Sequence, residues 1–327
     1  AGYTIRTHGM LKGISRTGWK VSCVTRPGYP HDRADTLHLE GERQRIIDGI
    51  SYDSIDGPSR YHTPSDEYLL QSAALIEAKA KEYRPQVIHA ASNYEAAIPA
   101  LIAARKLGVP FVYEVRGLWE YTAASTKFHW EDTERFQLSR KMESLAACGA
   151  NKVITLTQAL ADELCERGVE REKICLAPNA VEPDEFTSLP RDTALAESLG
   201  LSGNNFVVGY TGSITDYEGL DDLITALGEL IKGNPESRVL IVGGGPASST
   251  LYSKVKKARL DNFVHMVGKV PPGDVTRYMS LIDVIALPRK PFKVCQLVSP
   301  LKPLEAMAMK IPLVVSDVQA LGEMVEH

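Results

Sequence analysis

The sequence predicts an α/β protein of two Rossmann-like domains, each a parallel sheet covered by helices on both faces. Two observations lead to this prediction. Short apolar runs alternate with helical patterns along most of the chain, and a polar stretch at about residues 183–205 divides the alternation into two series. Alternating strands and helices are typical of parallel sheets. We therefore expect one domain over residues 1–186 and a second over residues 187–327.

The first series opens with a predicted helix over residues 4–17, which Gly18 ends before the strand WKVSCVT. Residues 26–64 are rich in Gly, Pro, Asp and Arg, so we expect a long loop with short strands there. Further helices are predicted at 66–82, 94–106, 130–148 and 159–167, and strands at QVIHA, PFVYEV, KVITL and KICLA.

The second series repeats this alternation after the polar stretch. Its predicted strands are FVVGYTG, RVLIVGG, NFVHMVG, VIALP and IPLVVS, and its helices cover 220–231, 249–259, 273–281, 301–309 and 319–326. Ligands bind at the carboxyl ends of the strands in open α/β sheets. We expect these ends of the two domains to face each other across a cleft.

Composition limits the classes of protein to consider. The chain has 327 residues, 44% of them hydrophobic, and a net charge of -4, which argues against a general nucleic-acid binder because such proteins need a concentrated basic face. Five cysteines without CxxC spacing predict reduced, cytoplasmic thiols and no structural zinc. No apolar run approaches the roughly 20 residues of a membrane span. We expect a protein that is neither secreted nor integral to a membrane.

The segment RKPFKVCQLVSPLKPLEAMAMKIPLVVSD, residues 289–317, has the strongest functional pattern. Lys302 lies between two prolines at the start of a predicted helix, whose free N–H groups attract phosphate, and Glu305 follows within the first turn. This combination predicts a site for a diphosphate. For the isolated segment, an amphipathic helix that only packs on a buried strand explains the pattern equally well.

Three glycine motifs are candidates for phosphate loops. Gly212 directly follows a predicted strand in GYTGSITDYEGL, where backbone amides and Ser213 could approach a phosphate. Gly2 precedes the first helix and either approaches a ligand or only serves a turn. In IVGGGP, Pro246 interrupts the run and the third glycine of a dinucleotide fingerprint is absent at the required offset, so we reject an NAD fingerprint here and expect no cofactor.

Two motifs of the first domain suggest carbohydrate binding. Arg116, Trp119 and Glu120 in YEVRGLWE end a buried strand with the polar and aromatic groups of a sugar-facing loop, although an internal Arg–Glu pair is common. Asn93 and Glu95 follow another strand end, in HAASNYE. A histidine such as His89 at this strand end is more often a core hydrogen-bonding residue than a base.

Taken together, GYTIRTHGMLKGISRTGWKV, the segment from VIHAASNYE to VRGLWE, ICLAPNAVEPDEF, GYTGSITDYEGL, IVGGGP, VHMVGKV and PLKPLEAMAMKIPLVVSD resemble glycosyltransferase family 4, which has the GT-B fold. The resemblance spans nearly the whole chain. It implies transfer of a sugar from a nucleotide-sugar to an acceptor with retention at the anomeric carbon and without a metal or cofactor. Within the family, the sequence is similar in particular to bacterial members that build surface polysaccharides.

The resemblance also implies roles for individual residues. Glu305 would bind the donor ribose, the loop Ser299-Pro300-Leu301 would offer backbone amides to the diphosphate, and Lys269 and Val270 would lie beside the nucleobase. Gly2 would approach the donor phosphate. Acceptor-binding residues would include Asn93, Arg116, Trp119 and Glu120, with Arg116 standing where many members carry a histidine.

Three positions depart from the family pattern. Leu297 stands where a glutamate usually approaches the donor sugar, and Ser213 and Glu218 replace a usual arginine and lysine. A departing nucleoside diphosphate needs positive charge when no metal supplies it. We therefore hypothesise that Lys302, with Arg289 or Lys290, neutralises the leaving group.

The resulting expectation is a UDP- or GDP-sugar transferase whose second domain binds the donor and whose first domain binds a sugar or lipid-linked sugar. A lipid-linked acceptor would bring peripheral contact with a membrane. We also expect the natural gene product to have a first strand before residue 1 and closing helices after residue 327. Alternatives are a nucleotide-sugar epimerase of the same fold, which would need no acceptor, and a degenerate nucleotide-binding module without transferase activity.

Overall fold

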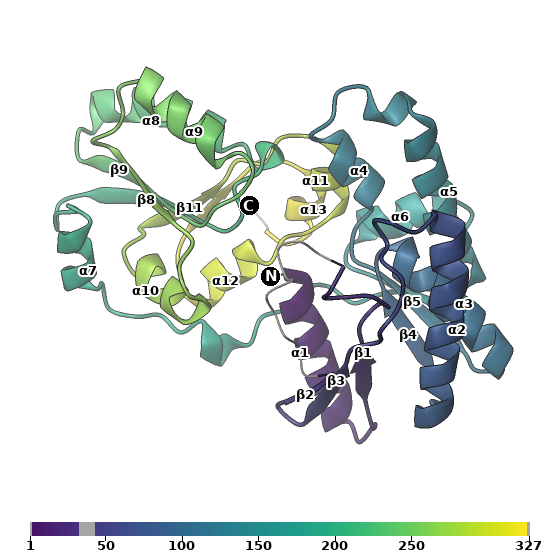
Figure 1. Ribbon diagram of the computed structural model, residues 1–327. Coiled ribbons are helices and arrows are strands. Elements are labelled where there is room, and N and C mark those ends of the chain that lie inside the picture. The colour runs from purple at the N-terminus through teal and green to yellow at the C-terminus, as the bar shows by residue number, and fades with distance from the viewer. Residues whose placement is uncertain (1, 33–42, 326–327) are drawn as a thin grey trace. The chain divides into compact units, whose positions relative to one another are not determined.

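The computed structural model describes residues 2–32 and 43–325 (Figure 1). The chain divides into two compact units. Unit 1 contains residues 1–122 and 129–178, and unit 2 contains residues 123–128 and 179–327. Unit 2 therefore starts before the boundary expected between residues 186 and 187, and it also includes a short segment from the first half of the chain.

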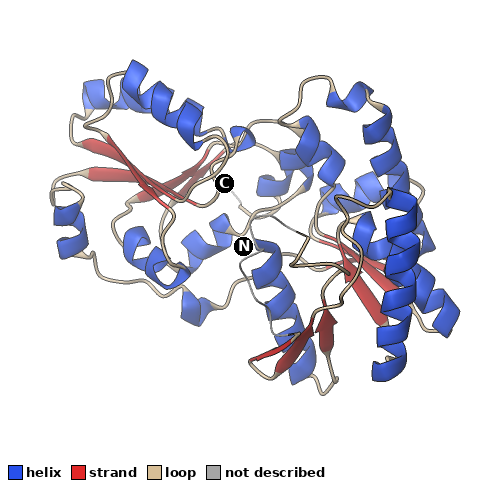
Figure 2. Cartoon of the chain, in the orientation of Figure 1, coloured by secondary structure: helices blue, strands red, loops and turns tan. Residues whose placement is uncertain are grey.

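Unit 1 is built on a four-stranded parallel sheet, which is drawn among the red arrows of Figure 2. The strand order is β4-β5-β6-β7. The central strand β5 is apolar at most positions because both faces of a parallel sheet are covered. Its strands are β4 (Ile88–Ala91), β5 (Phe111–Val115), β6 (Lys152–Thr155) and β7 (Ile174–Leu176), and its helices are α2 (Ser65–Tyr83), α3 (Tyr94–Leu107), α4 (Trp119–Ala124, which ends within unit 2), α5 (Glu134–Gly149) and α6 (Gln158–Glu166).

A second, three-stranded sheet lies in unit 1 beside the helix α1 (Gly2–Arg16). Its order is β1 (Ser22–Val24), β3 (Ile50–Asp53) and β2 (Gln44–Ile47). Asp48 and Gly49 join β2 to β3 with φ values of 50° and 78°, which are the left-handed conformations that a two-residue hairpin turn requires. The short strands expected between residues 26 and 64 are present, and residues 33–42 of that loop lie outside the described residues.

Unit 2 has a five-stranded parallel sheet with the order β10-β9-β8-β11-β12. Val207, Tyr210 and Ile241 are completely buried in its core. In Figure 1, α8 and α9 cover one face of the sheet, and α10 and α12 cover the other. The strands are β8 (Phe206–Thr211), β9 (Ser237–Val242), β10 (Val264–Gly268), β11 (Val284–Leu287) and β12 (Leu313–Val315), and the helices are α7 (Thr193–Ser198), α8 (Leu220–Gly233), α9 (Ser248–Lys257), α10 (Val275–Met279), α11 (Lys293–Leu297), α12 (Lys302–Ala308) and α13 (Gln319–Gly322).

The strand order of unit 2 reverses beside β8. The chain runs outward from β8 through β9 to β10, and then returns to the other side of β8 with β11 and β12. The loops after β8 and β11 consequently leave the sheet in opposite directions. This is the switch point at which open parallel sheets bind ligands. The predicted α/β class with two parallel-sheet domains is confirmed.

Several predicted elements were wrong in detail. The helix predicted over residues 130–148 is a 3₁₀ turn, Trp130–Asp132, followed by α5, because the Thr133 hydroxyl caps a new helix by accepting from the Phe136 N–H at 3.1 Å. Asp192 caps α7 in the same way, inside the polar stretch that divides the two predicted series, where no helix was predicted. The short helices α4 and α11 were also not predicted.

Candidate functional site

Three segments of unit 2 converge at the switch point. Residues 212–219 follow β8, residues 288–290 follow β11, and residues 299–305 lead into α12. Parallel strands bring the first two together because β8 and β11 are neighbours with Val284 paired to Val208. The candidate diphosphate motifs of the sequence therefore come to one place.

A buried cluster of charged side chains joins these segments. The Lys302 ammonium donates to Glu218 Oε1 at 2.7 Å, and the Arg289 guanidinium donates to the same oxygen at 3.0 Å. Glu218 and Arg289 are only 2% and 8% exposed. We call Glu218, Arg289 and Lys302 the Glu218 cluster. It contains two cations and one anion, and so it carries an excess of positive charge when all three are ionised.

Burial works against each charge in the Glu218 cluster. Burial opposes ionisation of Glu218, but the charges of Lys302 and Arg289 hold the pKa of this carboxyl below its usual value. Burial lowers the pKa of Lys302, although Glu218 acts in the opposite direction. Burial also disfavours the positive charge of Arg289, but Glu218 outweighs this effect and raises the pKa of the guanidinium. Of the two cations, Lys302 is therefore the one whose positive charge depends on the shared carboxylate.

Glycines make room for the cluster. A Cβ at Gly212 would lie 2.4 Å from Lys302 Cε, and the φ of Gly212 is 141°, a conformation that other residues rarely adopt. A Cβ at Gly243 would lie 1.8 Å from the carbonyl oxygen of Gly212. The lysine stem therefore crosses directly over a glycine turn. Ser213, at the end of this turn, is exposed, and its carbonyl accepts from the Tyr210 hydroxyl.

Glu305 lies one helical turn from Lys302 in α12. Burial raises the pKa of Glu305, while the charge of Lys302 lowers it. Glu305 makes no hydrogen bond or ion pair among the described residues outside the backbone pattern of the helix. A half-buried carboxyl without such a partner can accept hydrogen bonds from the hydroxyl groups of a ligand.

The other predicted donor-site residues occupy different positions in unit 2. Ser299 is 4% exposed, and its carbonyl accepts from Asn179 Nδ2 at 2.8 Å. Pro300 and Leu301 precede α12 and are half buried, and Leu301 is in the helical conformation. The stem of Lys269 packs 3.3 Å from where a Cβ of Gly244 would be, and Val270 packs against the hydrophobic core.

Arg289 and Lys290 have different surroundings, although they are adjacent in the sequence. Lys290 Nζ lies 2.6 Å from Asp221 of α8 and 3.9 Å from Asp222, and so it is outside the Glu218 cluster. Of the two alternatives for a partner of Lys302, the structure brings Arg289 to it. Leu297 is 3% exposed within α11 and packs in the interior.

In unit 1, Arg116 and Glu120 form internal ion pairs. Arg116 Nη2 donates to Glu114 at 2.5 Å, and Arg167 Nη1 donates to Glu120 at 2.6 Å. All four residues have side chains that are at most 5% exposed. The internal Arg–Glu pairing that the sequence left open is therefore present at both positions. Asn93, at the start of α3, is buried.

Trp119 remains accessible, with 39% of its surface exposed. The Arg60 guanidinium lies 6.0 Å from the Trp119 ring centroid and 4.8 Å from that of Tyr61, and it forms a 2.7 Å ion pair with Glu95. Sequence reasoning singled out Glu95 but missed Arg60 and Tyr61, because they come from a loop that shares no motif with the helix of Glu95. Gly2 is exposed at the start of α1, and Arg116 Nη1 donates to Tyr3 and Thr7 of the same helix.

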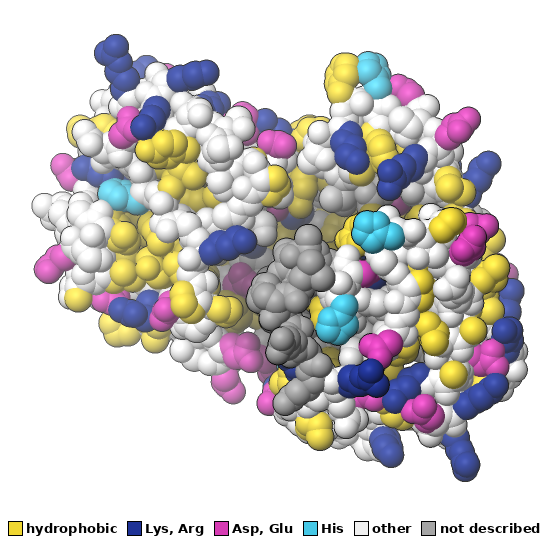
Figure 3. Space-filling model, in the orientation of Figure 1, with side chains coloured by type: hydrophobic (Ala, Val, Ile, Leu, Met, Phe, Trp, Pro, Cys, Tyr) yellow, Lys and Arg dark blue, Asp and Glu magenta, His cyan; other side chains and the backbone are white. Residues whose placement is uncertain are grey.

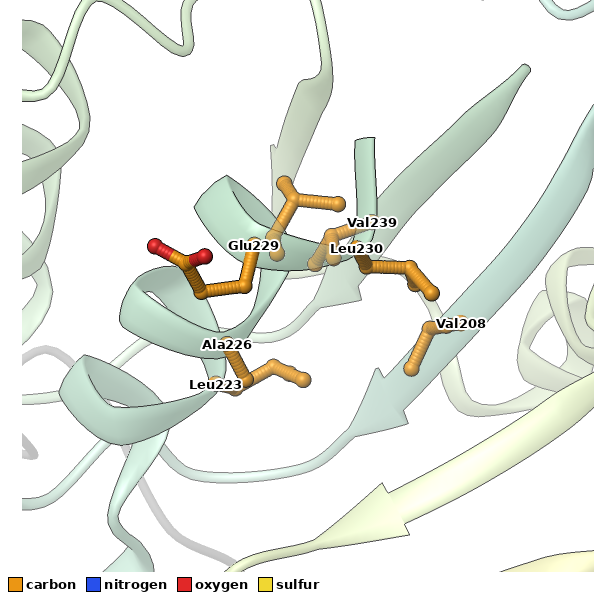
Figure 4. Close-up of a pocket in the computed structure, with 7 residues that line it drawn as sticks. Val208, Leu223, Ala226, Glu229, Leu230 and Val239 are labelled. Atoms are coloured by element: carbon orange, nitrogen blue, oxygen red, sulfur yellow. The ribbon is translucent and has the colours of Figure 1, made fainter. Parts of the chain in front are cut away.

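A large apolar hollow of unit 2 lies apart from the candidate site. It has a volume of about 440 Å³ and lies between α8 and the strands β8 and β9, where Val208 and Val239 face Leu223, Ala226 and Leu230 (Figure 4). Glu229 is the single charged residue that lines it. A lining so poor in polar groups is unsuited to a phosphate.

The surface drawn in Figure 3 has mixed charge. Lys and Arg side chains alternate with Asp and Glu over the described residues visible in that view, without an extended basic face. No helix within residues 2–32 and 43–325 combines the length and the apolar character that a membrane crossing needs.

Comparison with known proteins identifies the family. The model of the glycosyl transferase 4-like domain matches residues 1–180, and that of glycosyl transferases group 1 matches residues 205–327. The chain belongs to the family 4-like glycosyltransferases with the GT-B fold. Glycogen synthase of Mycobacterium tuberculosis is 28% identical over 75% of this chain and 55% of its own length. The chain thus spans about half the length of this curated relative.

Solved structures share the fold at low identity. The Anabaena protein HepE in complex with UDP and glucose aligns with a TM-score of 0.66 and 21% identity, over 85% of this chain and 71% of HepE. Sucrose-phosphate synthase from Thermosynechococcus elongatus aligns with a TM-score of 0.74 and 17% identity, over 98% of this chain and 77% of the synthase.

Proposed function

We propose that this family 4-like chain carries a retaining, metal-independent glycosyltransferase activity in the cytoplasm. It moves a sugar from a UDP- or GDP-linked donor to a sugar or lipid-linked sugar, in polysaccharide or glycolipid synthesis, with peripheral membrane contact for a lipid-linked acceptor. Unit 2 binds the donor and unit 1 the acceptor. The observation that carries this proposal is the buried Lys302 ammonium, which lies over a glycine turn at the switch point of a parallel sheet.

The cations of unit 2 suit the chemistry of this reaction. A nucleoside diphosphate gains negative charge as it leaves the sugar, and fixed positive charge stabilises that transition state most effectively where water is scarce. Lys302 supplies this charge next to the diphosphate, and Arg289 adds to the local potential. The acceptor hydroxyl attacks from the face on which the diphosphate departs, and the Glu305 carboxylate accepts hydrogen bonds from the donor ribose.

The family membership and HepE support a nucleotide-sugar donor. HepE was solved with UDP and glucose, and the solved structures that align with this chain share its fold. Lys269 and Val270, beside the glycine run of unit 2, would border the nucleobase.

The acceptor proposal rests on the exposed aromatic group of unit 1. Sugars stack on aromatic faces and hydrogen-bond to nearby charged groups. Trp119 offers such a face, and Arg60 and Glu95 offer the charged groups. Arg116 and Glu120, which lie buried in ion pairs, would hold this region in place.

Thermal unfolding with UDP, GDP, ADP and NAD tests the donor proposal. A ligand that binds only the folded state raises the melting temperature. We expect a rise with UDP or GDP and none with NAD. No rise with any nucleoside diphosphate would contradict donor binding. Product analysis with and without acceptor then separates transfer from epimerisation, because an epimerase converts the nucleotide-sugar without an acceptor.

The double variant Lys302→Ala, Arg289→Ala tests the charge proposal. We expect turnover to fall by about 10²–10³-fold, the usual effect of removing a group that stabilises transition-state charge. Lys232→Ala is the control, because Lys232 pairs with Glu229 on the exposed face of α8. Steady-state rates are compared after circular dichroism has established folding. Full turnover in the double variant would refute leaving-group neutralisation by this pair.

A further inference from the structure

The two cations of the Glu218 cluster differ in how many of their hydrogen-bond donors the protein engages. Arg289 donates from Nη1 to the carbonyl of Val298 at 2.9 Å and from Nη2 and Nε to Glu218 at 3.0 and 3.5 Å. Lys302 donates one hydrogen to Glu218. An ammonium has three donors, so two remain for a ligand. Arg289 also keeps two of its five donors, but its side chain is 8% exposed against 14% for Lys302, so Lys302 is the member of the cluster better placed to touch a phosphate.

The Lys302 ammonium is fixed by contacts on three sides. Its stem runs against Gly212, its nitrogen lies 5.1 Å from the ring centroid of Tyr210, and its hydrogen bond to Glu218 determines the remaining direction. The contact of the stem with Gly212 is apolar, and the attraction between the ammonium and the Tyr210 ring is weak. The carboxylate is the strong directional partner, and without it the flexible lysine stem is free to turn.

Glu218 is itself held rigidly. It ends the 3₁₀ turn Asp216–Glu218, and its N–H donates to the carbonyl of Thr215. The next residue, Gly219, has a φ of 70°, and a Cβ there would lie 1.8 Å from the carbonyl oxygen of Pro288. The 3₁₀ turn therefore packs closely against the segment that carries Arg289. The Glu218 carboxylate consequently has little freedom to move away from the two cations.

The ionisable groups around Lys302 show what the carboxylate contributes. Burial disfavours the positive charge of Lys302, and so does the charge of Arg289. Glu218 and Glu305 favour it. The Cys295 thiol of α11 and the Tyr210 phenol of β8 also face the cluster, and both have raised pKa values because they are buried. Both groups are therefore neutral over most of the working pH range. Loss of Glu218 would leave two buried cations beside one carboxyl, Glu305, whose own ionisation is disfavoured by burial.

We infer that Glu218 is a positioning residue of the donor site: it keeps Lys302 charged and aimed at the phosphate, and it does not itself contact the ligand. The identity of the ligand rests on the proposed function. The effect of Glu218 on Lys302 does not, because it is a property of the protein without a ligand.

The ligand-free test is an NMR titration of the lysine side chains. Protein labelled with ¹³C at lysine Cε is titrated from pH 6 to 11, and Lys302 is assigned with Lys302→Arg. We expect the Lys302 midpoint to fall by at least about one pH unit in Glu218→Gln, a tenfold change in proton affinity. Asp221→Asn is the matched control, because it removes the partner of the Lys290 ammonium in the same unit. An unchanged Lys302 midpoint in Glu218→Gln would overturn the inference.

The binding test uses UDP and calorimetry across pH 7 to 10. In Glu218→Gln, we expect the alkaline loss of UDP binding to begin at least about one pH unit lower than in the wild type. Glu218→Asp should restore part of the difference, whereas Asp221→Asn should follow the wild type. A merely structural role would weaken binding equally at every pH, and this outcome would overturn the inference. Failure of the wild type to bind UDP would instead refute that donor, and the NMR titration would still decide the role of Glu218.

Discussion

Gly212 illustrates at the residue scale how one missing side chain shapes the donor site. The space that a Cβ would take at this position lies 2.4 Å from Lys302 Cε, and the φ of 141° excludes most other residues. The lysine stem must pass Gly212 to reach Glu218. The backbone of the turn and the Lys302 ammonium therefore lie close together. A ligand phosphate could then meet backbone amides and the cation together.

We predict that Gly212→Ala weakens UDP binding at least about tenfold, equivalent to about 1.4 kcal/mol, because the methyl group displaces Lys302. Gly228→Ala is the control, since Gly228 lies within α8 and a Cβ there would meet nothing within 4 Å. Calorimetric dissociation constants for the two variants give the comparison. Equal affinities would mean that the position of the lysine does not govern binding.

Glu143 is a second residue whose state is set by its surroundings. It is 1% exposed, it accepts from the Tyr94 N–H at 2.8 Å and from the Tyr113 hydroxyl, and burial raises its pKa to about 7. Nearby Glu120 raises this pKa further, and Arg167 opposes the effect. The folded protein therefore favours the neutral carboxyl.

The raised pKa of Glu143 makes the stability of unit 1 depend on pH. A raised carboxyl pKa contributes stability below the unfolded value of 4.5, and that contribution is lost as pH rises through about 7. The loss is roughly 3 kcal/mol, because each tenfold difference in proton affinity between the folded and unfolded states is worth about 1.4 kcal/mol. We predict that Glu143→Gln loses less stability than the wild type between pH 5 and 8 in urea denaturation. Parallel pH profiles of the two proteins would contradict this prediction.

At the scale of elements, a buried arginine ties α4 to the end of α6. Arg167 directly follows α6 and donates to Glu163 of that helix at 2.9 Å and to Glu120 of α4 at 2.6 Å, with all three side chains at most 3% exposed. Buried carboxylates need such a partner, since their desolvation is otherwise uncompensated. The arginine therefore fixes the short helix α4, which begins with Trp119.

We predict that Arg167→Ala destabilises the protein by about 3–5 kcal/mol, the usual cost of removing one partner of a buried ion pair. Arg171→Ala should leave stability unchanged, because the Arg171–Asp162 pair is half exposed. Urea denaturation followed by circular dichroism measures both variants. A similar small effect of the two substitutions would show that the buried pair is dispensable.

The elements themselves were predictable where their signals are local. The strands of unit 2 are apolar runs bounded by glycine or polar residues, and the long helices follow the periodicity of the sequence. Errors occurred where one side chain decides the outcome, as with the Thr133 cap that starts α5. The Asp48-Gly49 pair between isoleucines is a recognised hairpin signal and could have located β2 and β3.

At the scale of the whole molecule, the proposed division of labour between the units can be tested by hydrogen exchange. We predict that UDP slows amide exchange in residues 212–219 and 299–305 of unit 2, because the ligand orders these loops. The central strand β5 of unit 1 should be unchanged and serves as the internal reference. Protection confined to unit 1 would reverse the assignment of the donor to unit 2.

The sequence by itself determined that this protein has two parallel-sheet domains and belongs to a sugar-transferring family. This was possible because strands covered on both faces must be apolar along their length, and because the motifs are contiguous. Only the tertiary structure decided how the charges pair. Lys302 meets Glu218 across 84 residues of sequence, and Arg289 joins them while its neighbour Lys290 pairs with Asp221. The physical reason is that these pairs depend on β11 returning beside β8, a strand order that no local periodicity encodes.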